Sequence, residues 1–479
     1  MLRIIGRLPG GLPVLARLFA GALCLLWTGR AGAAIDQELA DQARQGLHRA
    51  VTYLTEEVAH QGGYVGSYLA DLSQGFGKLG SRRGPTWNWI QSPGTPAMGF
   101  AFLHVWEATG EPPFLEAAVG VAHALVRGQL ESGGWDDNVD HSPQGERTYF
   151  YRRNAGSSDP RLTSGRNRST FDDNISQHAT RLLIAVDQAL AQQDASIREA
   201  VDAALELFIT AQDERGGWPQ NYPLAGRGYG DFYTYNDGAI RDCIDVLMLA
   251  YRTYGDPRYH DAVVRGGEFI LRTQLPEPHP IWAQQYDPEL QPAWARRMEP
   301  PAACAGESAG IVRLLPEIAI FTNDTRFLDP LPAALDWYQR SQIAEGRWAR
   351  YYELKTNRPL YQISRNRTAY WLSYEDHDTP DHYAFQGSWG RGLDTVRQAY
   401  EAMRATSPAD YARQRQPRER TRDEQLERAR RMESRVREVL DQQDKQGRWV
   451  ERRDGQDMLM MATFQRNLRT LADYLAPLP

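Results

Sequence analysis

Gln212-Asp-Glu-Arg-Gly-Gly-Trp218 lies between two segments with helical periodicity, and related copies recur along the chain. Apolar residues are spaced by three and four on both sides of it, over 196–212 and 237–254. A glycine can end a helix in the left-handed conformation, and the tryptophan after it can fold back over the core. The other copies are Gln129-Leu-Glu-Ser-Gly-Gly-Trp135, Ala344-Glu-Gly-Arg-Trp348 and Gln442-Gln-Asp-Lys-Gln-Gly-Arg-Trp449.

The same spacing of apolar residues predicts helices along most of the chain, whereas strand-like alternation is rare. The expected helices span 36–58, 95–109, 113–129, 172–192, 196–212, 237–254, 257–274, 306–321 and 327–343, with more near 390–405, 420–441 and 463–475. The tryptophans recur too irregularly for an open solenoid of equal repeats. We therefore expect an all-α fold, an (α/α) toroid of helical hairpins with a C-terminal helical extension.

The composition is that of a globular protein without a nucleic-acid footprint. The 479 residues are 42% hydrophobic and carry a net charge of −6, which offers no basic surface for nucleic acid. The three cysteines form no Cys-x-x-Cys pair, and no His-Glu-x-x-His segment is present, so zinc chemistry has no support. Cys243 and Cys304 are expected either to pair with each other or to be buried thiols.

The N-terminus has the pattern of a secretory signal. Arg3, Arg7 and Arg17 precede a short apolar run over 18–27, and small residues follow at 31–33. The run is too short to span a bilayer. We expect residues 1–33 to be removed as a signal peptide, leaving a periplasmic or secreted monomer that does not contact the membrane. The toroid domain is then expected over 34–405, and a charged linker with the helical extension over 406–479.

Two acidic segments precede predicted helices. The first is Phe171-Asp172-Asp173-Asn174 and the second is Tyr235-Asn236-Asp237-Gly238. Asp and Asn are common N-caps, so one interpretation is helix capping. One residue suffices for a cap, however, and several carboxylates in one cleft would repel each other unless a hard cation bridged them. Asp172, Asp173 and Asp237 are therefore candidate ligands of Ca²⁺.

A third group of polar segments is rich in arginine and aromatic residues. It comprises Trp294-Ala-Arg296-Arg297-Met-Glu299, Trp348-Ala-Arg350-Tyr-Tyr and Ser364-Arg365-Asn-Arg367. Guanidinium groups bind carboxylates in a fork geometry, and aromatic rings suit sugar faces. The aromatic residues expected in the cleft are Tyr233, Tyr235, Trp282, Trp294, Tyr351 and Tyr361. Together with the aspartates, these segments indicate an acidic polysaccharide as the substrate.

Several of these motifs, in order over roughly residues 60–390, resemble the pectate lyases of polysaccharide lyase family 10. They are Gly216-Gly-Trp-Pro-Gln-Asn-Tyr-Pro, Thr234-Tyr-Asn-Asp-Gly-Ala, Trp282-Ala-Gln-Gln-Tyr-Asp, Gly306-Glu-Ser-Ala-Gly-Ile-Val-Arg313 and Trp348-Ala-Arg-Tyr-Tyr-Glu with Thr356-Asn-Arg-Pro. The resemblance implies calcium-assisted β-elimination of polygalacturonate. It implies metal ligands at Asp172, Asp173 and Asp237, and substrate binding by Arg296, Arg350, Tyr235 and Glu299. It also implies an arginine base, Arg365 first and Arg358 second.

The chain departs from the family pattern in one segment, and two other functions stay open. Members carry a Glu-Arg-Arg motif where this chain has Asp378-Thr-Pro-Asp381-His382-Tyr-Ala-Phe385. A glycoside hydrolase acting on a uronate-containing glycan would need two carboxyl groups, for which Asp136-Asp137 and Glu375-Asp376 are candidates. A non-catalytic protein that binds acidic glycan would use the same arginines and aromatic residues without turnover.

Overall fold

The computed structural model describes residues 35–226, 228–364, 369–380, 383–416 and 418–478. Its longer helices lie where the apolar spacing predicts them. They are α1 (Gln37–Tyr53), α2 (Thr95–Thr109), α3 (Pro112–Gly128), α6 (Ile175–Ala189), α7 (Ala195–Thr210), α8 (Ala239–Tyr254), α9 (Pro257–Thr273), α10 (Ala305–Thr322), α11 (Leu331–Arg340), α12 (Asp394–Ala405), α14 (Arg422–Asp441) and α15 (Met461–Leu475). The shorter ones are α4 (Pro143–Thr148), α5 (Pro160–Thr163) and α13 (Pro408–Gln414).

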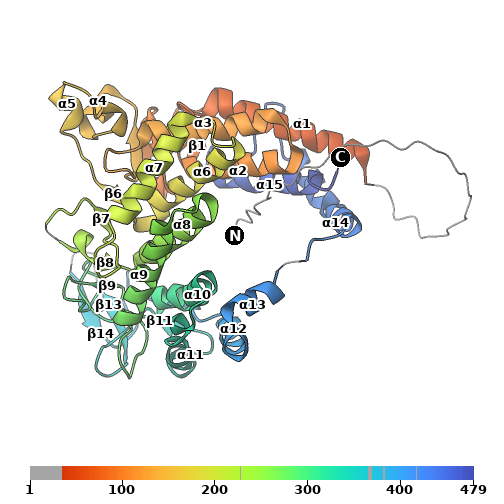
Figure 1. Cartoon of the computed structure of the whole chain (residues 1–479). Helices are drawn as coiled ribbons and strands as arrows, with labels where there is room; N and C mark the ends of the chain where they lie inside the picture. The colour runs from red at the N-terminus through yellow and green to blue at the C-terminus, as the bar shows by residue number, and fades with distance from the viewer. Residues whose placement is uncertain (1–34, 227, 365–368, 381–382, 417, 479) are drawn as a thin grey trace, which may run out of the picture.

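The helices pack as antiparallel pairs that follow one another along a curved double row (Figure 1). Successive pairs are α2 with α3, α6 with α7, and α8 with α9. The first helices of the pairs contact one another in the order α2, α6, α8 and α10, and the second helices do so in the order α3, α7 and α9. This double row is an (α/α) toroid, as the sequence predicts.

The recurrent glutamine and tryptophan motif joins each helical pair to its neighbour. The side-chain amide of Gln212 donates to the carbonyl of Gly216 in its own turn, at 3.0 Å, and to that of Ala262 in α9, at 2.9 Å. The fully buried Trp218 donates its indole N–H to Phe208 O at 2.8 Å. Other copies repeat this arrangement, with Gln129 bound to Gly133 and Ala200, and Gln443 bound to Gly447 and Gly46. The motif is therefore structural.

The strands are short, which is why alternation in the sequence could not reveal them. A five-stranded antiparallel sheet has the order β16-β17-β1-β2-β3, built from β1 (Ser67–Leu69), β2 (Gly75–Phe76), β3 (Arg82–Arg83), β16 (Val450–Arg453) and β17 (Gln456–Met460). A second sheet, of order β10-β12-β13-β14, contains β10 (Ala303–Cys304), β12 (Tyr351–Tyr352), β13 (Pro359–Ile363) and β14 (Trp371–Ser373).

Four two-stranded ladders join the turns at one end of the toroid. They pair β4 (Trp87–Trp89) with β5 (Asn138–Asp140), β6 (Ser169–Thr170) with β7 (Asn221–Tyr222), β8 (Tyr233–Thr234) with β9 (Gln285–Tyr286), and β11 (Trp348–Ala349) with β15 (Gln386–Gly387). Each ladder brings together segments that are distant in sequence, so it fixes the loops that carry the polar motifs.

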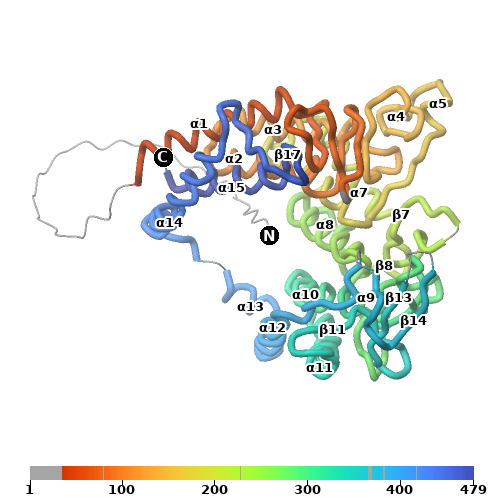
Figure 2. Tube along the Cα trace, turned by 180° about the vertical axis from the view of Figure 1, so that it is seen from behind, coloured from red at the N-terminus to blue at the C-terminus, as the bar shows by residue number. Residues whose placement is uncertain are grey.

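The C-terminal segment packs against the start of the chain. Helix α15 contacts α1 and α2, α14 contacts α1, and β17 pairs with β1 in the register Ser67 to Met460. Figure 2 shows this part of the chain from behind, with α14 and α15 beside α1 and α2. Residues 406–479, predicted as a linker and helical extension, therefore place two helices and a hairpin on the first helices of the toroid.

Most of the aromatic residues expected in the cleft lie in the core. Trp282 and Tyr351 are fully buried, and Tyr233, Tyr235 and Tyr361 are at most 7% exposed, so only Trp294 of this group is open to solvent. Cys243 and Cys304 are buried free thiols. The predicted signal peptide, residues 1–33, lies outside the described residues. Within the described ranges, no helix has the length and apolar character needed to cross a membrane.

Candidate functional site

Two equivalent turns carry the predicted metal ligands. The short helical turns η4 (Asp172–Asn174) and η6 (Asn236–Gly238) directly precede α6 and α8 and contact each other. In each turn, two successive residues have left-handed backbone conformations. These are Asp173 and Asn174 with φ of 51° and 59°, and Asp237 and Gly238 with φ of 46° and 79°. Asp, Asn and Gly tolerate this conformation best, so the residue types match the geometry.

Helix capping does not account for these aspartates. The residues at the N-cap positions of α6 and α8 are Asn174 and Gly238, and neither helix receives a hydrogen bond from its N-cap side chain. Asp173 and Asp237 each occupy the first left-handed position of their turn, and the two turns contact each other. We call Asp172, Asp173 and Asp237 the acid cluster.

Amide side chains hold the acid cluster together. Asn236 Nδ2 donates to Asp172 Oδ1 at 3.0 Å and to Asp237 Oδ2 at 2.8 Å, so one amide bridges two carboxylates. Gln220 Nε2 donates to Asp172 Oδ2 at 2.9 Å. Burial and the charges of Asp173 and Asp237 raise the pKa of Asp172 to about 6. Burial and the charge of Asp173 also raise the pKa of Asp237.

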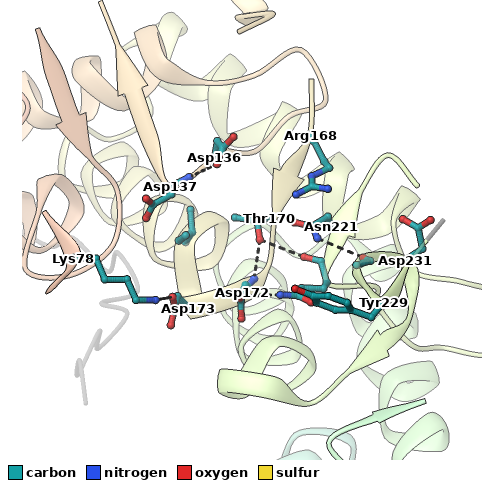
Figure 3. Close-up of a pocket in the computed structure, with 14 residues that line it drawn as sticks. Lys78, Asp136, Asp137, Arg168, Thr170, Asp172, Asp173, Asn221, Tyr229 and Asp231 are labelled. Carbon is teal, nitrogen blue, oxygen red and sulfur yellow. Dashed lines mark hydrogen bonds and ion pairs between the residues drawn. The ribbon is translucent and has the colours of Figure 1, made fainter. Parts of the chain in front are cut away.

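Lys78, which belongs to none of the sequence motifs, reaches the acid cluster from the N-terminal sheet. Its ammonium contacts Asp173 Oδ2 (Figure 3). Burial lowers the pKa of Lys78, but the hydrogen bond to Asp173 and the charges of all three aspartates outweigh it, so the pKa lies above its ordinary value. The amino-acid composition gives one indication of this residue. The chain has only three lysines among its 55 basic residues, and Lys78 is one of them.

The donors of the acid cluster suit a hard cation. Carboxylate and amide oxygens are the ligands that Ca²⁺ prefers, and Asn236 Oδ1 is buried without a hydrogen-bond partner. In the structure, however, the side chains of the acid cluster and Asn236 are not arranged as a coordination sphere. Among the residues that the structure describes, no group of three or more His, Cys, Asp or Glu side chains is placed to hold a metal ion. The chemistry of these donors therefore fits calcium. The side chains must move, however, for their oxygen atoms to converge on one ion.

Two of the predicted arginines gather around Tyr383, and we call these three residues the arginine cluster. Arg296 forms a fork with the buried Glu299, with Nε 2.9 Å from Oε2 and Nη2 2.5 Å from Oε1. Arg350 Nη2 lies 2.7 Å from Oε1 of Glu307. The guanidinium carbon of Arg296 lies 5.7 Å from the centre of the Tyr383 ring, and that of Arg350 lies 4.6 Å from it.

Tyr383 comes from the segment that departs from the family motif. Its hydroxyl donates to Glu299 Oε1 at 3.0 Å and is 2.7 Å from the hydroxyl of Tyr351. The arginine cluster lies close enough to the acid cluster that the charges of Arg350 and Arg296 lower the pKa of Asp237, against the effect of burial. Helix α10, which carries Glu307, also contacts η6, which carries Asp237, so the structure places Arg350 and its neighbours Arg296 and Glu299 on the Asp237 side of the acid cluster.

Three other predicted site residues lie elsewhere or cannot be placed. The Tyr235 ring is buried among Phe269 and Tyr286, and its hydroxyl lies 2.7 Å from Thr273 Oγ1, so it faces the core. Arg358 is exposed near the end of the loop between β12 and β13, with its guanidinium carbon 3.6 Å from the centre of the Tyr374 ring. Arg365 lies outside the described residues.

A pocket of about 440 Å³ opens on the side of the acid cluster that faces the N-terminal sheet. Asp172 and Asp173 line this pocket together with Asp136 and Asp137, which lie above them in Figure 3, and with Arg168 and Tyr229 on the right of that view. Five aspartates and two basic residues, Lys78 and Arg168, line the pocket, so its lining is polar and predominantly acidic.

The comparisons with known proteins agree with the sequence motifs. Residues 129–347 match the pectic acid lyase family. The match confirms the resemblance to pectate lyases over this part of the chain, and with it the expected enzyme class, a polysaccharide lyase. None of the curated proteins matches the sequence.

Solved structures with similar folds include a family 10 polysaccharide lyase from Cellvibrio cellulosa, with 21% identity, a TM-score of 0.45, and coverage of 58% of this chain and 91% of that chain. A mutant of a family 10 polysaccharide lyase from Cellvibrio cellulosa, in complex with trigalaturonic acid, has 20% identity, a TM-score of 0.44, and coverage of 59% and 91%. A D-mannose isomerase has 14% identity, a TM-score of 0.44, and coverage of 94% and 99%.

Proposed function

We propose that this polysaccharide lyase cleaves polygalacturonate, or a related acidic polysaccharide, by calcium-assisted β-elimination. The observation that supports the proposal is that η6, which carries Asp237, contacts α10, whose Glu307 pairs with Arg350, while the charges of Arg350 and Arg296 lower the pKa of Asp237. Hard anionic ligands next to guanidinium forks suit a substrate that carries a carboxylate on each sugar. The match of residues 129–347 to the pectic acid lyase family supports the same substrate class.

The elimination places defined demands on the site. A base takes the proton from C5 of a uronate, the electron pair forms the C4–C5 double bond, and the glycosidic oxygen leaves from C4 and is protonated. Negative charge accumulates on the carboxylate attached to C5, so Arg296 and Arg350 would bind and orient that carboxylate. Asp172, Asp173 and Asp237 would hold Ca²⁺, which when bound supplies further electrostatic stabilisation of this charge.

We assign the base to an arginine on the strength of the family resemblance, with Arg365 first and Arg358 second. The stacking of Arg358 on Tyr374 in an exposed loop favours Arg365. Arginine is ordinarily protonated at neutral pH, so a base must lie where neighbouring cations lower its pKa. Arg296 is unsuited to that role, because its hydrogen bond to Glu299 raises its pKa. It is suited to binding a carboxylate.

A non-catalytic protein that binds acidic glycan is the second candidate. The observation that favours it is that each arginine of the arginine cluster already pairs with its own glutamate, Arg296 with Glu299 and Arg350 with Glu307. Such a protein would bind oligogalacturonides and leave them intact.

Mass spectrometry of the products distinguishes these functions. We expect oligogalacturonide incubated with the protein and calcium to yield one fragment with a saturated end and one that is lighter by one water, since elimination consumes none. Two fragments of hydrolytic mass would identify a glycoside hydrolase. Intact substrate, with binding retained, would identify the non-catalytic protein.

We further propose that the protein is exported to the periplasm or secreted as a monomer after removal of residues 1–33. The apolar run over 18–27 and the small residues at 31–33 support export. Intact mass and light scattering of the exported protein test both points. A mass that includes residues 1–33 would contradict processing, and a dimer mass would contradict the monomer.

A further inference from the structure

Lys78 is held in place by the hairpin that carries it. It lies in the turn η2 (Lys78–Gly80), between β2 and β3. Gln74 Nε2 donates to the carbonyls of Gly75 and Arg83, each at 2.7 Å, and so ties the two strands together. The backbone N–H of Gly77 donates to Ser81 O at 2.8 Å across the turn. The lysine is therefore presented by a closed hairpin.

The hairpin is also anchored to the pocket wall and to the C-terminus. The mostly buried Arg83 lies 3.6 Å from Oδ2 of Asp137, whose Oδ1 accepts a hydrogen bond from the Trp89 indole at 3.0 Å. Strand β2 pairs with β1, and β1 pairs with β17 of the C-terminal hairpin. Residues before and after the part of the chain that matches the lyase family, 129–347, thus position Lys78.

The ammonium of Lys78 occupies the position of a counter-cation. It contacts Asp173 directly, and it is close enough to Asp172 and Asp237 for their charges to act on it. It is half exposed, so the lysine can leave Asp173 for solvent without crossing packed core. A divalent cation bound by the same carboxylates would meet a like charge at this point, and the two cations repel each other.

We propose that Lys78 competes with the divalent cation for Asp173 and thereby sets the calcium affinity of the acid cluster. This inference rests on the proposed function, because it concerns the metal assigned there. In the metal-free protein the ammonium neutralises part of the acid cluster. When calcium binds, Lys78 leaves Asp173 and its ammonium becomes available on the wall of the pocket.

Calcium binding to the Lys78→Met variant tests the competition. Titration calorimetry with calcium chloride, without substrate, is expected to give a dissociation constant about fivefold or more below that of the unmodified protein. Lys355→Met is the matched control, because Lys355 is an exposed lysine in the loop between β12 and β13, and the calcium affinity of this variant should be unchanged. Unchanged or weaker binding by Lys78→Met would overturn the proposal and leave the calcium site intact. No binding by any of these proteins would overturn the calcium site as well.

Acylation of the lysines provides a second measurement that does not depend on activity. With only Lys78, Lys355 and Lys445 in the chain, mass spectrometry resolves the reactivity of each towards acetic anhydride. Calcium should increase acylation of Lys78 several-fold and leave Lys355 and Lys445 unchanged. Asp173→Asn should produce the same increase without calcium, because it removes the partner. If the acylation of Lys78 responds neither to calcium nor to Asp173→Asn, both the contact of Lys78 with Asp173 and its competition with calcium are contradicted.

Discussion

Asp173 and Asp237 occupy equivalent positions in the turns before two neighbouring helices, and both have left-handed backbone conformations, with φ, ψ of 51°, 24° and 46°, 27°. Because α6 and α8 contact each other, the two turns lie side by side. Because the helical hairpin is repeated, a carboxylate recurs at the same position before each of the two helices. This internal equivalence creates the acid cluster, and the backbone conformation is a requirement for it.

Substitutions at Asp173 separate its charge from its backbone conformation. We expect Asp173→Asn to lose calcium binding and to keep its thermal stability, since asparagine tolerates the left-handed region. Asp173→Ala should lose binding and also unfold more easily, by about 1 kcal/mol relative to Asp173→Asn. Calorimetric calcium titration and thermal unfolding of both variants check this. Equal stability of the two would show that the conformation imposes no constraint at this position.

Calcium affinity should depend on pH through Asp172. Its pKa of about 6 in the metal-free protein means that calcium must displace a proton below pH 6, so the apparent affinity should fall about tenfold per pH unit there and level off above pH 7. The same shift lowers the stability of the metal-free protein as pH rises from about 4 to 6, because the native state holds this proton more tightly than the unfolded chain. Calcium titrations between pH 5 and 8 measure the first effect. A calcium affinity that does not change between pH 5 and 8 would show that calcium binds to other ligands.

Arg350→Lys should reduce activity without unfolding the protein. Lysine keeps a positive charge beside the buried Glu307 but loses the planar fork that binds a carboxylate, so we expect kcat/KM to fall about 100-fold. Alanine is less informative, because it would leave Glu307 unpaired, at a cost of about 3–5 kcal/mol. Arg347→Lys is the matched control at an exposed arginine, and should retain full activity. Full activity in Arg350→Lys would exclude substrate binding through the fork.

The contact between the chain ends through Gln443 should contribute measurably to stability. Gln443 Nε2 donates to Gly46 O in α1 at 2.9 Å, and Oε1 accepts from Arg49 at 2.8 Å. Gln443→Ala should lower the free energy of unfolding by about 1–3 kcal/mol, because the freed carbonyls are partly buried. The exposed neighbour Gln446→Ala serves as a control with an expected change within about 0.5 kcal/mol. Denaturant unfolding of both variants distinguishes them, and equal values would contradict a role for the motif in closing the toroid.

Helical spacing was sufficient to predict the longer helices and the toroid, since each helix buries one continuous apolar face. Asp172, Asp173 and Asp237 were named from the sequence because they exceed the need of a helix cap and match the family motifs, whereas the contact between their turns comes from the packing of α6 against α8. Strands of two or three residues left no alternation to read. Tyr235 was misleading for a related reason: it belongs to the segment that carries the aspartates, but its side chain points into the core.

Contacts between distant segments could not be predicted from spacing. Lys78 reaches Asp173 only because β1 pairs with β2 and β17, and Tyr383 reaches both arginines from a segment in which the sequence departs from the family. Neither residue belongs to a motif. The rarity of lysine in a chain rich in arginine was the one compositional sign that pointed to Lys78.

The most direct test is the ultraviolet absorbance of polygalacturonate incubated with the protein, because only elimination creates a conjugated C4–C5 double bond. We expect a steady rise that requires calcium, stops on addition of chelator, and is absent in Asp173→Asn at equal concentration. Absorbance that does not rise with calcium on polygalacturonate or related uronans, or that rises equally in Asp173→Asn, would contradict calcium-assisted elimination at the acid cluster.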